Sequence, residues 1–222
     1  MLSINSERLR QNIEALSQIG RKSDQGIYRT AFSDADMEAR SWLKQQIEQA
    51  GLECYQDGAA NIHARLCWRE DVASVITGSH IDSVPGGGHL DGALGVMAGL
   101  ECLHRLKELD VQLKRPLEAI SFSDEEGRFG GIFGSSALCG RLTPKAIHAA
   151  HDLKGITITE AMAKQGRNAM DALSAARPPE SMHAVVALQI EQGRVLARHH
   201  LHRAAVPPFG PLFTRSVRCI GR

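Results

Sequence analysis

The 222-residue sequence predicts an α/β fold with a mixed central sheet flanked by helices. Short apolar segments of strand length alternate with segments whose apolar residues recur at helical spacing. Glycine-rich stretches separate these segments at turn positions. Acidic and histidine residues follow two of the predicted strands directly, as ligand-binding residues do at the carboxyl edge of an α/β sheet.

The first third of the chain predicts two helices and three strands. Residues 1–19 predict an amphipathic helix, because four apolar residues recur there at helical spacing. Ser33 suits the N-cap of a second helix, and Gly51 suits its end. We expect the strands at residues 52–55, 61–67 and 72–77, with a turn at 58–61 between the first two.

The middle of the chain continues the alternation. A glycine-rich stretch over residues 78–88 precedes a helix predicted over 92–106, and the apolar segment 117–123 predicts a strand that ends at an acidic cluster. Thr143 followed by Pro144 predicts the cap and first residue of a short helix. The last predicted elements are a helix over residues 169–176 and a strand over 184–190.

Composition limits the function classes. Hydrophobic residues make up 43% and charged residues 23%, and the formal net charge is +1, so we expect a soluble protein with no membrane span and no nucleic-acid partner. The first helix lacks the apolar core and cleavage site of a signal peptide, which predicts a cytoplasmic location. The five cysteines are odd in number and form no CxxC pair, which argues against a disulfide framework or a zinc ribbon.

Histidine and carboxylate residues stand at metal-ligand spacing beside these strands. His80 and Asp82 follow one predicted strand, Asp91 precedes the next helix, and Glu125 and Glu126 follow the next strand. A divalent cation needs imidazole and carboxylate ligands that converge from separate segments. Of two neighbouring carboxylates, one can bind the cation while the other takes a proton from the attacking water. The pattern predicts a metal centre for hydrolysis.

Each motif taken singly has a simpler explanation. His80 and Asp82 could be a loop histidine beside a turn aspartate, although an extended chain would let Asp82 accept the second ring N–H of His80. Asp91 could be a helix N-cap, and Glu125 with Glu126 could be a solvated acidic turn. The glycines at residues 86–88 lack the sequence context of a phosphate-binding loop. Only the ordered combination favours the metal centre.

Four ordered motifs carry a resemblance to a known family. They are Gly-Ser-His-Ile-Asp-Ser-Val at residues 78–84, Gly-Gly-His-Leu-Asp-Gly-Ala-Leu-Gly-Val at 87–96, Ser-Phe-Ser-Asp-Glu-Glu-Gly at 121–127 and Ile-Glu-Gln-Gly at 190–193. With them the chain resembles the peptidase M20-type metallohydrolases, in the amidase, hydantoinase and carbamoylase branch that contains N-carbamoyl-L-amino-acid hydrolases, allantoate amidohydrolases and β-ureidopropionases. The resemblance runs from about residue 27 to 193 and includes Arg29, Asp57 and Asn61.

This resemblance implies the N-terminal part of a metallopeptidase-like catalytic domain with defined roles for its residues. His80 would bind one of two divalent ions (zinc or manganese, with cobalt possible), Asp91 would bridge them, and Glu126 would bind the other. Glu125 would be the general base and acid, and Asp82 would orient His80. The substrate would be a small N-carbamoyl or ureido amino-acid derivative whose linear amide C–N bond is hydrolysed, and family members would be homodimers.

The chain also departs from the family. Gln189 stands where the family has a metal-binding histidine, and its neutral amide oxygen is a poorer ligand for zinc or manganese. Residues 192–222 contain six arginines and no acidic residue, and the family's dimerisation domain and last metal-binding histidine are not recognisable there. We therefore expect a catalytic domain at residues 1–195, an irregular basic tail at 196–222, and a truncated or frame-shifted product that retains metal weakly.

The alternative is an inactive remnant of a metal site that acts as a binding module through its basic tail. Six arginines could contact phosphates of a nucleic acid or an acidic partner, with binding that weakens as salt is added. Few aromatic residues lie among them, which favours the hydrolase.

Overall fold

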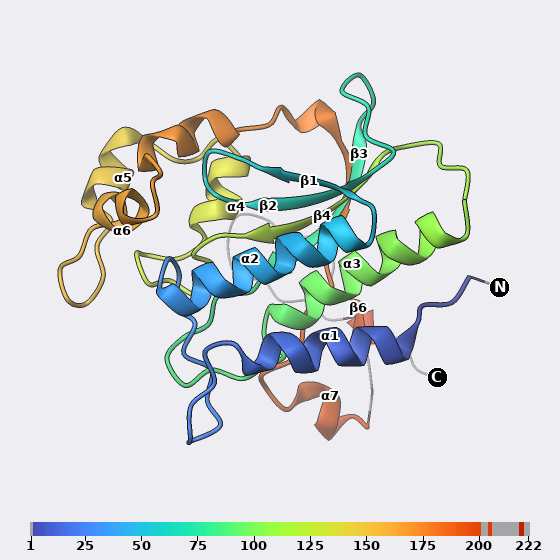
Figure 1. Cartoon of the computed structure of the whole chain (residues 1–222), viewed down its shortest axis with the longest axis horizontal. Coiled ribbons are helices and arrows are strands. Elements are labelled where there is room, and N and C mark those ends of the chain that lie inside the picture. Colours follow the sequence, from blue (N-terminus) through green and yellow to red (C-terminus); the bar gives the residue numbers. More distant parts are fainter. Residues whose placement is uncertain (1, 201–203, 206–217, 220–222) are drawn as a thin grey trace. The chain divides into compact units, whose positions relative to one another are not determined.

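The core of the molecule is one mixed sheet of five strands. The computed structural model describes residues 2–200, 204–205 and 218–219, and the chain divides into two units, residues 1–189 and 190–222. β3 is parallel to β4 and β5, whereas β1 and β4 are both antiparallel to β2, so the predicted mixed sheet is confirmed. The strands run in the order β1 (Glu53–Gln56), β2 (Ile62–Leu66), β4 (Leu117–Phe122), β3 (Ser74–His80) and β5 (Met182–Val186) (Figure 1).

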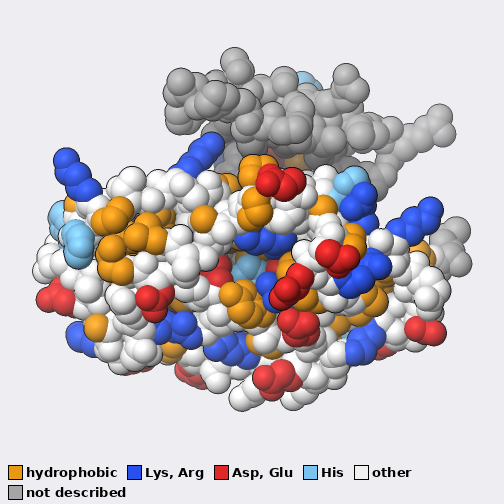
Figure 2. Space-filling model, turned by 90° about the horizontal axis from the view of Figure 1, so that it is seen from above, with side chains coloured by type: hydrophobic (Ala, Val, Ile, Leu, Met, Phe, Trp, Pro, Cys, Tyr) orange, Lys and Arg blue, Asp and Glu red, His pale blue; other side chains and the backbone are white. Residues whose placement is uncertain are grey.

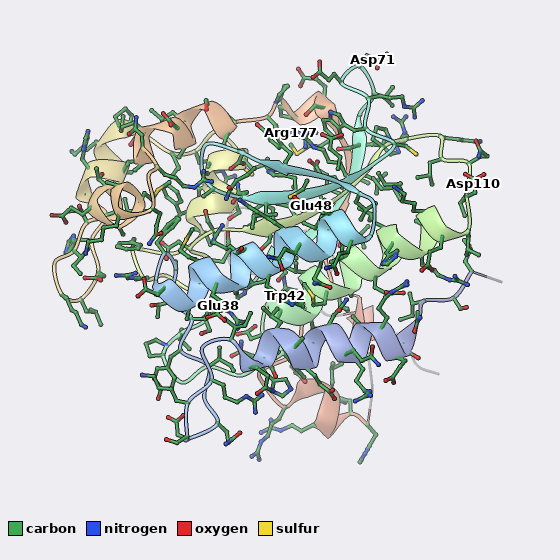
Figure 3. The ribbon with its side chains drawn as sticks, viewed as in Figure 1. Glu38, Trp42, Glu48, Asp71, Asp110 and Arg177 are labelled. Carbon is green, nitrogen blue, oxygen red and sulfur yellow. The ribbon has the colours of Figure 1, made fainter. Side chains whose placement is uncertain are left out.

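Three long helices cover one face of the sheet (Figure 1). They are α1 (Ser6–Gln18), α2 (Asp34–Gln49) and α3 (Ala93–Glu108). The side chains of Asn5 and Ser33 cap α1 and α2 by accepting backbone N–H groups of the first turn. Buried Leu43 of α2 and Met97 of α3 belong to the core beneath these helices, and Trp42 projects from α2 at the margin of that core (Figure 3).

A buried ion pair joins α1 to α3. Arg8 donates hydrogen bonds of 2.6 and 2.9 Å to the two carboxylate oxygens of Glu101, which is 2% exposed. The backbone N–H of Asn5 donates to the same carboxylate at 2.7 Å. An ionised carboxylate is costly to bury without a partner. The hydrogen bonds from Arg8 and Asn5 therefore offset the cost of burying Glu101 beneath α1.

On the other face one short helix packs against the sheet, and further short helices pack with it in a second apolar cluster. They are α4 (Phe133–Leu138), which packs against the sheet, α5 (Pro144–Ala149), α6 (Ile158–Lys164) and the 3₁₀ helices η1 (Ala169–Ala175) and η2 (Pro179–Ser181). Ile76 and Ile120 of the sheet pack with Leu138 of α4 on this side. Because β4 has helices on both faces, four of its six residues are buried. β5 forms an edge of the sheet and leaves Val185 and Val186 exposed.

Several elements differ from the sequence-based expectation. The segment expected as a helix over residues 169–176 forms η1, a 3₁₀ helix, and the last strand begins at Met182 and ends at Val186 instead of spanning 184–190. The short helices α4 and α6 were not predicted. A capping box formed by Thr157 and Glu160 marks the start of α6 in the sequence, whereas α4 follows Gly130 and Gly131 and has only six residues.

A network of buried charges crosses the sheet. His63 of β2 is 1% exposed, with Nδ1 lying 2.9 Å from Oε1 of Glu118 and Nε2 lying 3.3 Å from Oδ2 of Asp57. Arg177, labelled in Figure 3, donates a 2.5 Å hydrogen bond to Glu118. Burial opposes the charged form of His63, but the two carboxylates outweigh it and raise its pKa. The network is structural and belongs to the sheet.

The second unit contributes α7 (Val195–Arg198) and an antiparallel pair, β6 (Ala204–Ala205) with β7 (Arg218–Cys219). Most of the tail expected at residues 196–222 lies outside the described residues, so its irregular structure and its binding role stay predictions. Among the helices that the structure describes, none combines the length and apolar character needed to cross a bilayer. Charged side chains of both signs are interspersed on the face shown in Figure 2, as expected for a net charge of +1.

Candidate metal centre

The predicted site residues lie where parallel strands end at one edge of the sheet. His80 is the last residue of β3, and Glu125 and Glu126 follow β4 by three and four residues. Since β3 and β4 run parallel, their carboxyl ends meet at the same edge. Asp91 comes from a third segment, directly before Gly92, which is the N-cap of α3.

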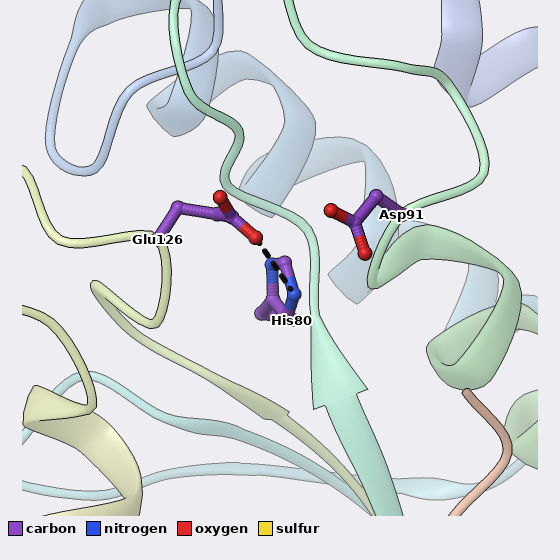
Figure 4. Close-up of side chains that lie close together, drawn as sticks. All are labelled: His80, Asp91 and Glu126. Carbon is purple, nitrogen blue, oxygen red and sulfur yellow. Dashed lines mark ion pairs between the residues drawn. The ribbon is translucent and has the colours of Figure 1, made fainter. Parts of the chain in front are cut away.

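Three side chains converge at this edge (Figure 4). His80, Asp91 and Glu126 are half-buried, and one ligand atom of each lies within 4.8 Å of the others. His80 Nε2 is 3.5 Å from Glu126 Oε1. One imidazole and two carboxylates from separate segments form a donor set that suits zinc or manganese. The structure therefore brings together all three residues expected as ligands.

The backbone of Asp82 orients the His80 ring. His80 Nδ1 lies 2.9 Å from the carbonyl oxygen of Asp82, whereas the nearest carboxylate oxygen of Asp82 is 3.6 Å away. With Nδ1–H donating to that carbonyl, the lone pair of Nε2 is left for a cation. The expected partner was the Asp82 carboxylate; in the structure the carbonyl makes this hydrogen bond because the carboxylate is turned toward the loop after β4.

The Asp82 carboxylate holds the segment that bears both glutamates. It accepts hydrogen bonds from the backbone N–H groups of Glu125 at 3.4 Å and Glu126 at 3.1 Å. Asp82 is 2% exposed, and burial raises its pKa although the nearby His80 acts in the opposite direction. Asp82 thereby fixes the end of β3 against the loop that follows β4.

Glu125 and Glu126 are both held in surroundings that disfavour their charged forms. Burial raises the pKa of Glu125, whose Oε1 accepts a hydrogen bond of 3.0 Å from the backbone N–H of Ser135. Burial also raises the pKa of Glu126, and the neighbouring charge of Asp91 adds to this effect against that of His80. A divalent cation between Asp91 and Glu126 would remove their repulsion, so the residues present fit a metal ion.

Gly92 leaves room for the His80 ring. Its φ is +63°, and a Cβ atom built there would lie 2.4–2.5 Å from three ring atoms of His80. No side chain fits in that space without displacing the ring, so glycine is required both by the backbone conformation and by the close approach. Asp91 also lies at the N-terminal end of α3, where the helix dipole favours a negative charge.

Asn61 joins the two ends of the loop that carries the glutamates. Its Oδ1 accepts a 3.0 Å hydrogen bond from the backbone N–H of Ser123, and its Nδ2 donates to the carbonyl of Gly134 at 3.1 Å. Asp57 accepts a second hydrogen bond from Nδ2 at 2.8 Å. Within the loop, Asp124 has a φ of +50° and its carboxylate accepts the N–H of Phe129. Burial and the charge of Asp82 raise the pKa of Asp124 to about 7.

Some of these contacts could not be predicted from the sequence. Asn61 and Asp57 belong to the family pattern, but their hydrogen bonds to the loop are long-range and have no signal in the local sequence. Ser135 contributes only its backbone N–H, which any residue could supply. Gln189 is exposed and follows β5 on the same edge, and the carbonyl of its neighbour Leu188 lies next to Gly95 in the first turn of α3.

The family model described as peptidase family M28 matches residues 61–200 of the chain, which include His80, Asp91 and Glu126. The chain belongs to peptidase family M28. The match does not carry the M20 label, which stays a prediction. The solved structure of a hydantoinase/carbamoylase family amidase from Burkholderia ambifaria is 32% identical with a TM-score of 0.81, and the alignment covers 90% of this chain and 48% of that one. The predicted resemblance to hydantoinase/carbamoylase amidases is thereby confirmed.

Two of the similar curated proteins are named amidohydrolases. The chain is 40% identical over 197 residues to an N-carbamoyl-L-amino acid amidohydrolase of Geobacillus stearothermophilus, an alignment that covers 87% of this chain and 48% of the relative. It is 37% identical over 187 residues to an allantoate amidohydrolase of Bacillus subtilis, which covers 83% of this chain and 45% of the relative. The chain thus spans about half the length of the curated relatives it matches.

Proposed function

We propose that this chain is the metal-binding half of a hydrolase for the carbamoyl or ureido C–N bond of amino-acid derivatives. The observation that carries the proposal is the convergence of His80, Asp91 and Glu126, with ligand atoms within 4.8 Å of one another. The names of the relatives support the substrate class, because both act on compounds with a terminal –NH–CO–NH₂ group.

His80, Asp91 and Glu126 would hold two divalent ions, with Asp91 as the ligand common to both. Zinc or manganese fits this donor set, and cobalt is a useful substitute. When bound, such ions polarise the amide carbonyl and lower the pKa of water near them. Asp82 positions both sides of the site, His80 through its carbonyl and the glutamate backbone through its carboxylate.

Glu125 is the general base and acid. It accepts a proton from the attacking water and donates a proton to the departing nitrogen, so that one water molecule is consumed and ammonia leaves. The remaining carbamic acid then loses carbon dioxide and yields the amino compound. Burial is the main cause that raises the pKa of Glu125. The raised pKa brings this carboxyl group closer to the range in which it can both take and return a proton.

The site lacks one ligand of the family pattern, and this defines the test. Gln189→His supplies an imidazole after β5, so we expect the variant to bind cobalt more tightly than the wild-type chain, as followed by isothermal titration. Ammonia release from N-carbamoyl amino acids and from allantoate is then measured with the cobalt-loaded Gln189→His chain. Adding Glu125→Gln to that chain is expected to abolish ammonia release and to leave cobalt affinity intact.

Three results would contradict the proposal. If neither the wild-type chain nor Gln189→His binds cobalt, or if His80→Ala binds as well as the wild type, the three side chains do not form a metal centre. If Glu125→Gln leaves ammonia release unchanged, Glu125 is not the proton carrier.

A further inference from the structure

Arg29 is a buried arginine that lies far from the site residues in the sequence. It contacts the backbone between two of those residues, His80 and Asp82. Arg29 is 2% exposed, and its Nε donates a 2.6 Å hydrogen bond to the carbonyl of Ile81, which stands between His80 and Asp82. Its Nη1 donates to the carbonyls of Leu16 at 3.0 Å and Ile19 at 2.8 Å, at the C-terminal end of α1. The guanidinium therefore bridges α1 and the segment after β3.

The backbone of Arg29 holds the same segment from the other side. Its N–H donates to Oγ of Ser83 at 3.1 Å, and its carbonyl accepts the N–H of Ser83 at 2.9 Å. Ile81 and Ser83 are thus both fixed, and Asp82 lies between them. The three hydrogen bonds by which Asp82 orients His80 and the glutamate loop depend on this short segment.

Capping α1 does not by itself explain a buried arginine here. Arg21, a less buried residue, already donates from Nε to the carbonyl of Ser17 at 3.0 Å at the same end of α1. Burial lowers the pKa of Arg29, and only the more distant charges of Asp36 and Asp82 offset this cost. Among the described residues, its guanidinium donates hydrogen bonds to main-chain carbonyls, two at the end of α1 and one at Ile81.

We propose that Arg29 is a positioning residue of the metal centre, which fixes the His80–Asp82 segment through the Ile81 carbonyl and couples it to α1. The inference rests on the function proposed above. Arg29 touches neither metal nor substrate; it acts by holding the carbonyl and carboxylate of Asp82 at the places where they orient His80 and the backbone of Glu125 and Glu126.

The test compares equally buried arginines. Arg40 is also 2% exposed, but its hydrogen bonds go to Asp36 at 2.8 Å and to the carbonyl of Ala60. Its charge acts on Asp82 through space, and lysine in its place keeps that charge. Arg29→Lys and Arg40→Lys both keep the charge and lose the planar fork of donors. Each full-length variant is titrated with cobalt, and the visible absorption of the bound cobalt reports ligand geometry while a urea titration reports stability.

We expect Arg29→Lys to bind cobalt about 10-fold more weakly and Arg29→Gln up to about 100-fold more weakly, the range seen when residues that orient ligands are replaced. The cobalt absorption spectrum changes in both. Arg40→Lys loses stability but keeps the affinity and spectrum of the wild type. If Arg29→Gln does not fold, the comparison of Arg29→Lys with Arg40→Lys still tests whether Arg29 positions the metal centre.

The outcomes separate the two proposals. Wild-type affinity and spectrum in Arg29→Lys, or equal losses in Arg29→Lys and Arg40→Lys, would overturn the positioning role and leave the proposed function intact. A wild-type chain and a Gln189→His chain that both bind no cobalt would overturn the proposed function, and the role of Arg29 with it.

Discussion

Replacing Gly92 by alanine should weaken metal binding, because the added Cβ atom would collide with the His80 ring. The new Cβ would lie 2.4 Å from Cε1 and 2.5 Å from both nitrogens of the His80 ring, whereas ordinary contacts begin near 3.4 Å. The ring must therefore retreat by about 1 Å, which is enough to spoil the geometry of a ligand. We expect the affinity for zinc or cobalt to fall about 10- to 100-fold, as it does when a ligand loses its orientation.

The backbone contributes a second, separable cost. Gly92 has a φ of +63°, and an alanine in this left-handed region costs roughly 1–2 kcal/mol. Gly166 is the matched control, because its φ is +69° and nothing lies within 4 Å of a Cβ built there. Gly166→Ala should lose a similar free energy of unfolding and keep its metal affinity.

Urea unfolding in the presence of a chelator measures the backbone cost, and calorimetric titration with zinc or cobalt measures the site. We expect Gly92→Ala to lose at least as much stability as Gly166→Ala, because it also displaces the His80 ring, and we expect Gly92→Ala alone to lose metal affinity. Equal affinities in Gly92→Ala and Gly166→Ala would show that the His80 ring does not need the space above Gly92.

Two further predictions concern the buried network and the loop. Burial alone would raise the pKa of Glu118, but His63 and Arg177 lower it from 4.5 to about 2, so its contribution to stability is complete above pH 4.5 and is lost as the pH falls toward 2. Glu118→Gln should cost about 3–5 kcal/mol at neutral pH and flatten the acid limb of a urea-unfolding series; an unchanged limb would contradict the assignment. Asn61→Asp replaces the donor to the Gly134 carbonyl by an acceptor and should cost about 1–3 kcal/mol, with faster hydrogen exchange of the Ser123 amide. Wild-type protection of that amide would mean that Asn61 does not hold the loop.

Much of the fold follows from local pattern. The apolar segments before His80 and Glu125 are strands because they are buried on both faces, and the helix from Ala93 to Glu108 follows from its apolar spacing. The proximity of His80 and Glu126 was predictable too, because parallel strands must end at one edge and each residue follows such a strand. Asp91 stands before α3, and its place in the site followed from the ordered motifs. These predictions need only the order of residues along the chain.

The supporting contacts could not be predicted, because they join residues far apart in sequence. Arg29 reaches Ile81, 52 residues away, and Asn61 reaches Ser123, 62 residues away. Asp82 was expected to orient His80 through its carboxylate, but which of two oxygen-bearing groups takes the ring N–H depends on what else approaches, and the glutamate loop approaches the carboxylate. Six-residue α4 is too short to carry a periodic signal.

The bridge between α1 and the rest of the molecule bears on limited proteolysis. Cleavage in the stretch between α1 and Arg29 would free the segment that carries Arg8, the partner of the Glu101 carboxylate, and would expose that carboxylate and the apolar side chains beneath α1 to water. The same cut would deprive Arg29 of the Leu16 and Ile19 carbonyls. A protease that removed the first twenty residues would therefore loosen the metal-binding edge from a distance, without touching any of its ligands.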